Sequence, residues 1–351
     1  MSIDAPLDPS RICRVLVTKL RHHGDVLLAS PVFSALKRHL PDAEIDALIY
    51  HDTRDMLSGH PALSQLHLAA KGGALRDEWR LFQTLRERHY DLLIHLTSSP
   101  RGAWLARLLK PEMAVAPNHP GKLYRNSFTH LYKNANGRHI VECNLDALRR
   151  IGLWPEEADK RLLLVAGDAA DKVAENHLSN LGLATGRFIL LHPTSRWLFK
   201  TWPEEKVAEL ASQLAEHGYS LLFTSGPDAK EIEMVQRIQA RLPFTTASLA
   251  GKLSLKELAA LIDRARLFIG VDSAPMHMAA AANTPVVVLF GPSGSNLWGP
   301  WQVASRVITS EHGCRPCGLD GCGGGKRSDC LDVIPVAHVL KAALELLERP
   351  L

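Results

Sequence analysis

Asp272 and Ser273 stand in the segment 270–293, GVDSAPMHMAAAANTPVVVLFGPS, which reads as a buried strand, a helix of small residues and a second strand. At the start of that helix a Ser or Asp side chain could be a simple cap, with Pro275 suited to the first turn. The same position exposes the backbone N–H groups of Ser273 and Ala274, which are good donors to a phosphate. The sequence therefore allows both interpretations of this position, helix capping and diphosphate binding.

A second segment, LLHPTSRWLFKTWP at 190–203, carries hydroxyl and basic side chains directly after an apolar run. Thr194 and Ser195 offer adaptable hydroxyl donors, and Lys200 offers a flexible point charge, a combination that suits a diphosphate. His277, near the first turn of the other helix, could donate to phosphate or satisfy a hydrogen bond in the core.

A third segment, TSGPDAKE at 224–231, places Asp228 and Glu231 where a strand becomes a helix. Either carboxylate could accept hydrogen bonds from ribose hydroxyls, although acids at a helix start also serve as dipole partners. The sequence contains neither a P-loop motif nor the GxGxxG pattern of dinucleotide-binding proteins.

The first half of the chain offers a different chemistry in VTKLRHHGDVLLASPV at 17–32. Asp25 could be an acid at a helix start, or a general base if it faces a substrate hydroxyl. The basic loop before it could hold an anionic acceptor. The residues expected to contact that acceptor are Lys19, Arg21, His22 and Gly24.

These segments must be positioned by alternating strands and helices. Strands are predicted at 12–18, 45–50, 91–96 and 112–116, and again at 187–192, 220–225, 267–271 and 285–290. Helices are predicted at 25–39, 74–89, 101–109 and 140–152, and again at 203–217, 228–240, 254–265 and 275–282. Continuous Val, Ile and Leu runs between amphipathic helices indicate an α/β protein with two doubly wound parallel sheets.

The chain has 351 residues, of which 46% are hydrophobic and 22% charged, enough for two domains with separate cores. An N-terminal domain is expected over 1–160, a linker over 161–186 and a C-terminal nucleotide-binding domain over 187–332. The remaining residues, 333–351, are expected to form a last helix that could return to the N-terminal domain.

Charge and patterning narrow the class of protein. The N-terminus lacks the pattern of a secretory signal, and no apolar run approaches the roughly 20 residues that span a bilayer, so we expect a cytoplasmic protein. A net charge of +4 is too small to indicate a nucleic-acid-binding protein but suits an anionic substrate or an acidic membrane surface.

Four of the six cysteines, Cys314, Cys317, Cys322 and Cys330, fall in the stretch CRPCGLDGCGGGKRSDC. Their spacing resembles a zinc site, but four free thiols or two local disulfides fit it as well.

The stretches KLRHHGDVLLASPVFSALKRHLP, HIVECNLDALRRIGL, LHPTSRWLFKTWP, GVDSAPMHMAAAANTPVVVLFGPS and CRPCGLDGCGGGKRSDCL together resemble glycosyltransferase family 9, the bacterial lipopolysaccharide heptosyltransferases. Within the family, SRWLFKTWP and GVDSAPMHMAA are most similar to the type III enzymes, which add a side-branch heptose to the inner core. The resemblance implies a GT-B fold with two Rossmann-like domains, ADP-heptose as donor, and inverting transfer without metal or cofactor. It also implies a phosphorylated lipopolysaccharide inner-core acceptor, with peripheral contact at the cytoplasmic face of the inner membrane.

The resemblance also assigns roles residue by residue. The family's base falls on Asp25, its diphosphate ligands on Thr194, Ser195 and Lys200, and its Asp-Thr-Gly turn on Asp272, Ser273 and Ala274. Ala274 replaces the family's glycine, which keeps the backbone donor but narrows the approach to it. Other expected donor contacts are His277, Glu231 or Asp228 at the ribose, and Leu253 against the adenine.

Three alternatives stay open at this point. The acceptor could be that of a type I or II heptosyltransferase. A nucleotide-sugar epimerase would share the architecture and the anion site but would transfer nothing to an acceptor. A non-catalytic nucleotide or glycolipid-binding module would not need Asp25.

Overall fold

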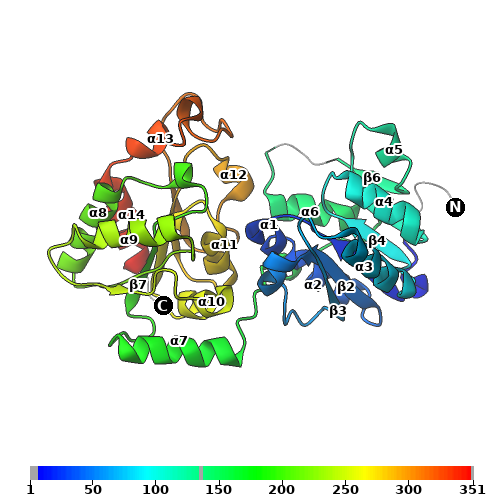
Figure 1. Cartoon of the computed structure of the whole chain (residues 1–351), viewed down its shortest axis with the longest axis horizontal. Coiled ribbons are helices and arrows are strands. Elements are labelled where there is room, and N and C mark those ends of the chain that lie inside the picture. Colours follow the sequence, from blue (N-terminus) through cyan, green and yellow to red (C-terminus); the bar gives the residue numbers. More distant parts are fainter. Residues whose placement is uncertain (1–6, 134–136, 349–351) are drawn as a thin grey trace. The chain divides into compact units, whose positions relative to one another are not determined.

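The computed structural model describes residues 7–133 and 137–348. The chain divides into two compact units, Met1–Val165 and Ala166–Leu351 (Figure 1). The division lies within the linker expected over 161–186, and each unit contains one six-stranded sheet.

The first unit is built on a parallel sheet with the strand order β3-β2-β1-β4-β5-β6. Its central strand β1 pairs in register with β2 on one side and with β4 on the other, so that Val15 lies opposite Ile45 and Leu92. The strands are β1 (Arg14–Thr18), β2 (Glu44–Tyr50), β3 (Gln65–Ala69), β4 (Leu92–His95), β5 (Met113–Pro117) and β6 (His130–Tyr132). The helices are α1 (His23–Leu27), α2 (Ser30–His39), α3 (Leu75–Glu87), α4 (Pro100–Leu109), α5 (Lys122–Arg125) and α6 (Ile140–Arg149), with short 3-10 turns at Pro9–Arg11, His51–Met56 and Ala158–Lys160.

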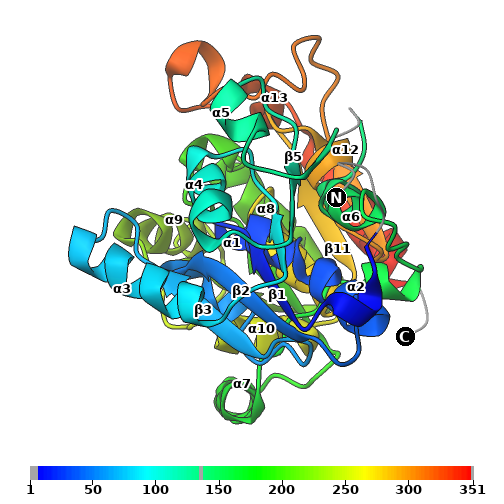
Figure 2. The ribbon, with the colours of Figure 1, turned by 90° about the vertical axis from the view of Figure 1, so that its right-hand side faces the viewer.

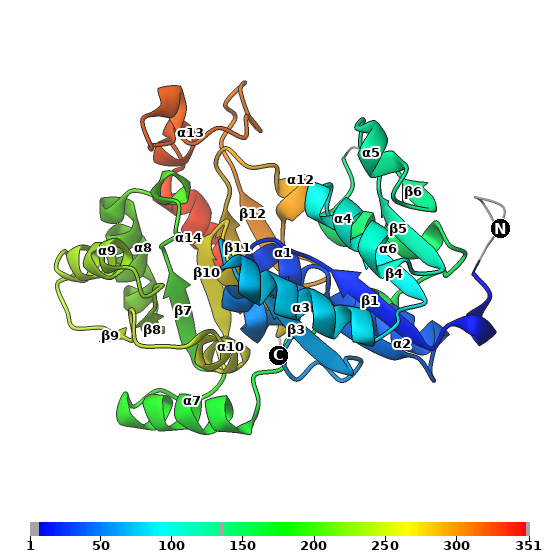
Figure 3. The ribbon, with the colours of Figure 1, turned by 45° about the vertical axis from the view of Figure 1, so that its right-hand side comes forward.

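The apolar runs that predicted the central strands are buried because helices cover both faces of the sheet. Every residue of β4 and β5 is buried. Helices α3 and α4 pack on the same face, where Leu85 and Leu105 join Leu16 and Leu93 in one core (Figure 3). Helix α2 packs against α6 within the same unit.

The second unit repeats this topology. Its strand order, β12-β11-β10-β7-β8-β9, is that of the first sheet when its strands are numbered from β7. The strands are β7 (Phe188–His192), β8 (Ser220–Phe223), β9 (Ala247–Ser248), β10 (Leu267–Val271), β11 (Val286–Leu289) and β12 (Ser305–Ile308). The helices are α7 (Asp168–Asn180), α8 (Glu204–Glu216), α9 (Ala229–Gln239), α10 (Leu255–Asp263), α11 (Ala274–Ala281), α12 (Ser295–Trp298), α13 (Asp329–Asp332) and α14 (Val336–Leu347), with 3-10 turns at Leu198–Lys200 and Cys322–Gly324.

Two expectations about the domain ends need correction. The expected linker contains a helix, α7, which packs on α10 of the second unit and is tied to it where Arg264 donates to Asp171 at 2.7 Å. The last helix, α14, contributes Val339, Ala343 and Leu346 to the core that also contains α8 and α9. It therefore completes the second unit, because its apolar face is buried on that sheet. Residues 349–351 of the expected helix lie outside the described residues.

Candidate active site

The two sheets place their chemistry-bearing loops at equivalent points. In a doubly wound sheet, ligands bind beyond the carboxyl ends of the strands where the strand order reverses. That point lies between β1 and β4 in the first unit and between β7 and β10 in the second. Gly270 of β10 is in register with His192, the last residue of β7, so the loops that follow these two strands start side by side.

In the second unit, Lys200 and Asp272 come from the loops that follow β7 and β10, and their side chains are in contact. The Lys200 ammonium lies 2.5 Å from Asp272 Oδ2, and both side chains are largely buried, with 15% and 9% exposed. The ammonium also lies 5.1 Å from the centre of the Trp197 ring, a distance at which a cation is attracted to the aromatic face. Contacts on two sides hold the charge of Lys200 at the end of the sheet.

Helix α11 presents its N-terminus beside this ion pair. Ser273 occupies the cap position but makes no side-chain hydrogen bond to the helix, and its hydroxyl donates instead to the Val271 carbonyl at 3.3 Å. The carboxylate of Asp272 is engaged by Lys200. Simple capping by either side chain therefore does not describe this helix start, and the first N–H groups of α11 receive no side-chain cap from Ser273.

Glu231 returns from the first turn of α9 to the end of β8. Its Oε2 accepts hydrogen bonds from Thr194 Oγ1 at 2.6 Å and from the backbone N–H of Gly226 at 3.3 Å. A Cβ atom at Gly226 would lie 2.7 Å from Glu231 Oε1, so a glycine is needed for the carboxylate to fold back there. Glu231 thus joins the loop after β8 to the loop after β7.

Asp228, the other candidate for the ribose contact, has a structural task. It is the N-cap of α9, and its Oδ1 accepts a hydrogen bond from the Lys230 N–H at 2.9 Å. Because Asp228 caps the helix while Glu231 reaches Thr194, the geometry favours Glu231.

Three other predicted donor contacts surround this group. Ser195 is buried, and its Oγ accepts a hydrogen bond from the Trp197 N–H at 3.3 Å, which shapes the loop before Lys200. His277 is buried on α11. Leu253 is half-buried beside the turn at Gly251, where a Cβ would collide with Ile232 of α9. Its loop therefore lies next to the helix that carries Glu231.

In the first unit Asp25 lies in the first turn of the short helix α1. Its side chain is 13% exposed, and Arg21 lies across from it with 3.8 Å between Nε and Oδ1. His22 and Arg21 are exposed and Gly24 is half-buried, so this loop is accessible. The neighbouring His23 is engaged elsewhere, because its Nε2 lies 2.7 Å from the Asp52 carbonyl oxygen.

The expectation that Lys19 contacts the acceptor is corrected by its burial. The side chain is 3% exposed, and its ammonium donates to the Leu96 carbonyl at 3.2 Å and to Asn144 Oδ1 at 3.0 Å. Burial lowers the pKa of Lys19 to about 8, and the charge of Asp25 opposes that shift. Lys19 therefore joins β1, β4 and α6 inside the unit and places a cation near Asp25.

Three buried polar residues, Asn144 on α6 and the histidines that end β4 and β7, were missed by sequence reasoning. Asn144 also donates from its amide to the Leu28 carbonyl at 2.9 Å, which ties α6 to the end of α1. His95 ends β4 and lies 2.5 Å from Thr18 Oγ1, while His192 ends β7 and lies 2.9 Å from Thr224 Oγ1. The available signal for the two histidines was a polar residue at the end of an otherwise apolar run, as in LLIH and FILLH.

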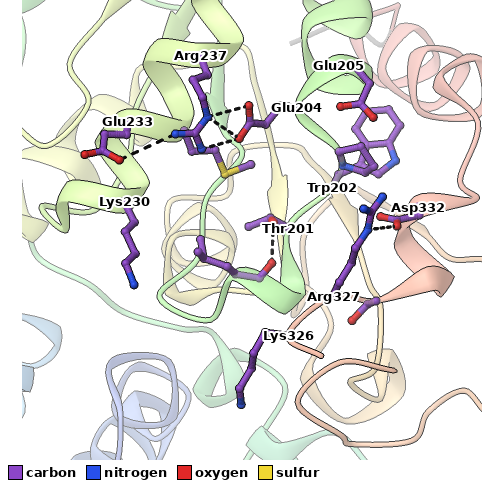
Figure 4. Close-up of a pocket in the computed structure, with 14 residues that line it drawn as sticks. Thr201, Trp202, Glu204, Glu205, Lys230, Glu233, Arg237, Lys326, Arg327 and Asp332 are labelled. Carbon is purple, nitrogen blue, oxygen red and sulfur yellow. Dashed lines mark hydrogen bonds and ion pairs between the residues drawn. The ribbon is translucent and has the colours of Figure 1, made fainter. Parts of the chain in front are cut away.

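A separate cavity of about 560 Å³ lies in the second unit, beside the segment that contains Leu198 and Thr201 (Figure 4). Its wall includes Thr201 and two ion pairs, Arg237 with Glu204 and Arg327 with Asp332. None of the predicted donor residues lines it among the described residues. Its lining carries four basic and four acidic side chains, so it lacks the concentrated positive charge that a diphosphate requires.

The four clustered cysteines are free thiols in this structure, three of them exposed and Cys330 buried. Within residues 7–133 and 137–348 no group of His, Cys, Asp or Glu side chains is arranged to hold a metal ion. Because all four thiols are free, the structure does not contain the two local disulfides that the sequence left open.

Comparisons with known proteins agree with this architecture. The model of glycosyltransferase family 9 (heptosyltransferase) matches residues 78–325. Lipopolysaccharide heptosyltransferase 3 of Escherichia coli is 38% identical over 81% of this chain and 85% of its own length. The crystal structure of the family 9 glycosyl transferase from Veillonella parvula superposes with a TM-score of 0.82, at 26% identity, over 99% of this chain and 98% of that one. That of E. coli heptosyltransferase WaaC with ADP superposes with a TM-score of 0.74 at 20% identity, over 95% of this chain and 99% of that one, a likeness of fold.

The matched family settles the class of enzyme. Both the expected GT-B fold and the expected likeness to the type III enzymes are confirmed, and the epimerase and binding-module alternatives are set aside. The chain belongs to glycosyltransferase family 9, the heptosyltransferases, and is a glycosyltransferase.

Proposed function

We propose that this enzyme transfers heptose from ADP-L-glycero-D-manno-heptose to a heptose of the phosphorylated lipopolysaccharide inner core. The similarity to a protein named lipopolysaccharide heptosyltransferase 3 supports this choice of reaction. The acceptor is a membrane glycolipid, so the enzyme works in the cytoplasm, in peripheral contact with the inner membrane. No helix within the described residues is long and apolar enough to cross a membrane.

The observation that carries the proposal is the grouping of Lys200, Asp272 and the start of α11 at the switch point of the second sheet. A diphosphate placed there faces an ammonium, the N–H groups of Ser273 and Ala274 and the hydroxyls of Thr194 and Ser195. These donors stabilise the negative charge that grows on ADP as it leaves, and such preorganised groups usually contribute the largest catalytic effect.

We assign the remaining donor contacts to residues beside this group. Glu231, held beside Thr194, accepts from the ribose hydroxyls, and Leu253 packs on the adenine. Asp272 orients donor hydroxyls, and its ion pair with Lys200 rearranges when the diphosphate competes for the ammonium. His277 donates from α11 to phosphate.

The first unit supplies the base and the acceptor contacts. Asp25 accepts the proton of the acceptor hydroxyl while that oxygen forms a bond to the anomeric carbon of the heptose. The bond from this carbon to the diphosphate breaks in the same step, and the electron pair leaves with ADP. Attack opposite the leaving group inverts the anomeric centre. Arg21, His22 and Gly24 contact the anionic acceptor near the base.

The proposed reaction uses no metal, because Lys200 supplies the positive charge at the leaving group. Transfer should therefore be unchanged after treatment with a chelator, measured as ADP release by protein freshly purified without added metal. Stoichiometric metal in that protein, with activity lost on its removal, would contradict this part of the proposal.

The test of the function is transfer to a defined acceptor. Purified enzyme is incubated with ADP-heptose and core oligosaccharides that end after the first inner-core heptose, after the second, or lack heptose. Mass spectrometry should show one added heptose residue on the acceptor that carries both heptoses, with ADP released in equal amount. Addition to either of the other two acceptors would indicate the acceptor choice of type I or II enzymes, and no transfer to any of them would contradict the proposed function.

A further inference from the structure

An apolar groove of about 300 Å³ opens on the first unit between α3 and α4. Large apolar side chains on its rim are more exposed than is usual for such residues: Leu75 by 89%, Trp79 by 57%, Trp104 by 55% and Leu108 by 50%. Helices α3, α4 and α5 form one flank of this unit (Figures 2 and 3). We define the outer surface of these three helices as the α3–α5 face.

The rim residues belong to outward-facing positions of two helices whose other faces form the core. On α4, Trp104 and Leu108 are four residues apart and exposed, while Ala103 and Leu105 are buried against the sheet. On α3, Leu75 and Trp79 have the same spacing, whereas Leu85 is buried. The exposed tryptophans are therefore not needed to complete the hydrophobic core.

The α3–α5 face is also positively charged. Residues 100–125, which include α4 and α5, contain five Lys or Arg residues and one acidic residue, a net charge of +4, whereas α3 carries three Arg and three acidic residues and adds no net charge. The acid, Glu112, pairs with Arg11 at 2.7 Å, and Arg101 pairs across the groove with Glu78 at 2.5 Å. The other four cations, Arg107 and Lys110 at the end of α4 and Lys122 and Arg125 on α5, are exposed, as is Leu123 of α5.

We propose that the α3–α5 face docks on a bilayer surface that contains anionic lipid. Tryptophan and leucine side chains partition into the interface between headgroups and acyl chains, and surrounding Lys and Arg are attracted to anionic headgroups. The reason for a membrane partner rests on the proposed function, in which the acceptor is a glycolipid. A second copy of this chain fits less well, because pairing two such faces would bring two sets of like charges together.

The experiment measures sedimentation of the purified full-length enzyme with phosphatidylcholine vesicles that either contain or lack phosphatidylglycerol. The parent enzyme should bind the anionic vesicles more tightly. Trp79→Ala with Trp104→Ala should weaken that binding by roughly tenfold or more, because two large apolar side chains no longer insert. Trp154→Ala removes a tryptophan that is 65% exposed elsewhere in the first unit, and this matched control should bind like the parent.

A second variant tests the charge independently. Arg107→Glu with Lys122→Glu reverses two exposed cations and should also reduce binding to anionic vesicles by at least about tenfold. Both variants should melt close to the parent temperature, because the replaced side chains are exposed. Should the tryptophan variant fail to fold, the charge variant still decides the proposal.

Three results would overturn the docking proposal. They are equal binding to charged and neutral vesicles, parent-like binding by the folded variants, and self-association without vesicles that the tryptophan substitutions abolish. Transfer to a deacylated acceptor in solution separates this proposal from the proposed function. The variants should retain that transfer and lose it selectively for acceptor embedded in vesicles, whereas a parent enzyme inactive on the deacylated acceptor would contradict the function alone.

Discussion

Lys200 and Asp272 form an ion pair that changes how each residue is interpreted. From the sequence they had separate tasks, one at the diphosphate and the other at the donor hydroxyls. In the structure they lie 2.5 Å apart, so each positions the other before substrate arrives. The sequence could not predict this pair, because the two residues are 72 positions apart and only the strand order brings their loops together.

Lys200→Ala should reduce turnover by roughly 10²-fold, because one preorganised charge at the leaving diphosphate is lost. ADP affinity should fall too, since the Asp272 carboxylate would then face the diphosphate without its counter-charge. Turnover is measured by ADP release and affinity by calorimetry. Lys341→Ala, at an exposed position of α14, is the control and should leave both unchanged. Unaltered turnover and ADP affinity in Lys200→Ala would mean that the donor site lies elsewhere.

Gly226→Ala tests the ribose contact without touching the carboxylate itself. The added Cβ would lie 2.7 Å from Glu231 Oε1 and push the carboxylate away from Thr194. Loss of a hydrogen bond to a charged group should raise the KM for ADP-heptose by roughly tenfold, with a smaller effect on kcat. Gly313→Ala, where a Cβ meets no atom within 4 Å, is the matched control. A parent-like KM in Gly226→Ala would count against Glu231 as a donor ligand.

At the scale of elements, the strands that the sequence predicted are the central ones. The run LFIGV predicted a strand at 267–271, and β10 has those bounds, because a strand buried on both faces is continuously apolar. The four strands that were not predicted, β3, β6, β9 and β12, are the edges of the two sheets. An edge strand has one neighbour and is short or partly exposed, as Ala247–Ser248 and Ser305–Ile308 are, so its sequence lacks that run.

Helix boundaries near the first site show the same limit. One helix was predicted at 25–39, but the structure has α1 and α2, separated after Leu27, with Pro31 in the first turn of α2. The break matters because it makes the helix that carries Asp25 only five residues long. Lys19 was misjudged for a related reason. A lysine beside a basic loop is expected to be exposed. Only the position of α6 next to the end of β1 shows that Lys19 is buried and donates to Asn144.

Buried histidines at the strand ends predict how stability depends on pH. Burial lowers the pKa of His192 from 6.5 to about 4, so between these values the unfolded chain binds a proton that the folded chain does not. The contribution of His192 to the free energy of unfolding is therefore complete above about pH 6.5. It declines as the pH falls toward 4, by up to roughly 3 kcal/mol.

His192→Asn should thus flatten the loss of melting temperature between neutral pH and about pH 5, because asparagine cannot titrate there yet can still bond Thr224. His217→Asn, at an exposed site on the surface, should melt with the pH dependence of the parent. An unchanged slope in His192→Asn would show that this ring is not kept neutral by burial.

In the molecule as a whole, one strand order occurs twice, and candidate site residues follow strands at the point where the order reverses in each copy. Asp25 follows β1 in the first unit, while Lys200 follows β7 and Asp272 follows β10 in the second. The division of labour between the two units, with the base in the first and the donor site in the second, stays a prediction. The sequence could assign each loop to a strand end, but not the contacts between loops, since these depend on strands distant along the chain.

The proposed mechanism depends on Asp25 as the base, and Asp25→Asn removes that function alone. The amide keeps the size of the side chain but cannot accept the acceptor's proton at neutral pH, so acceptor-dependent ADP release should fall by at least about 10²-fold. The proposed donor site lies in the second unit, so thermal stabilisation by ADP should remain close to that of the parent. Asp42→Asn, at an exposed position of the first unit, should keep parent activity. A rate for Asp25→Asn within roughly tenfold of the parent would contradict the claim and make Asp25 an acid that only supports the start of α1.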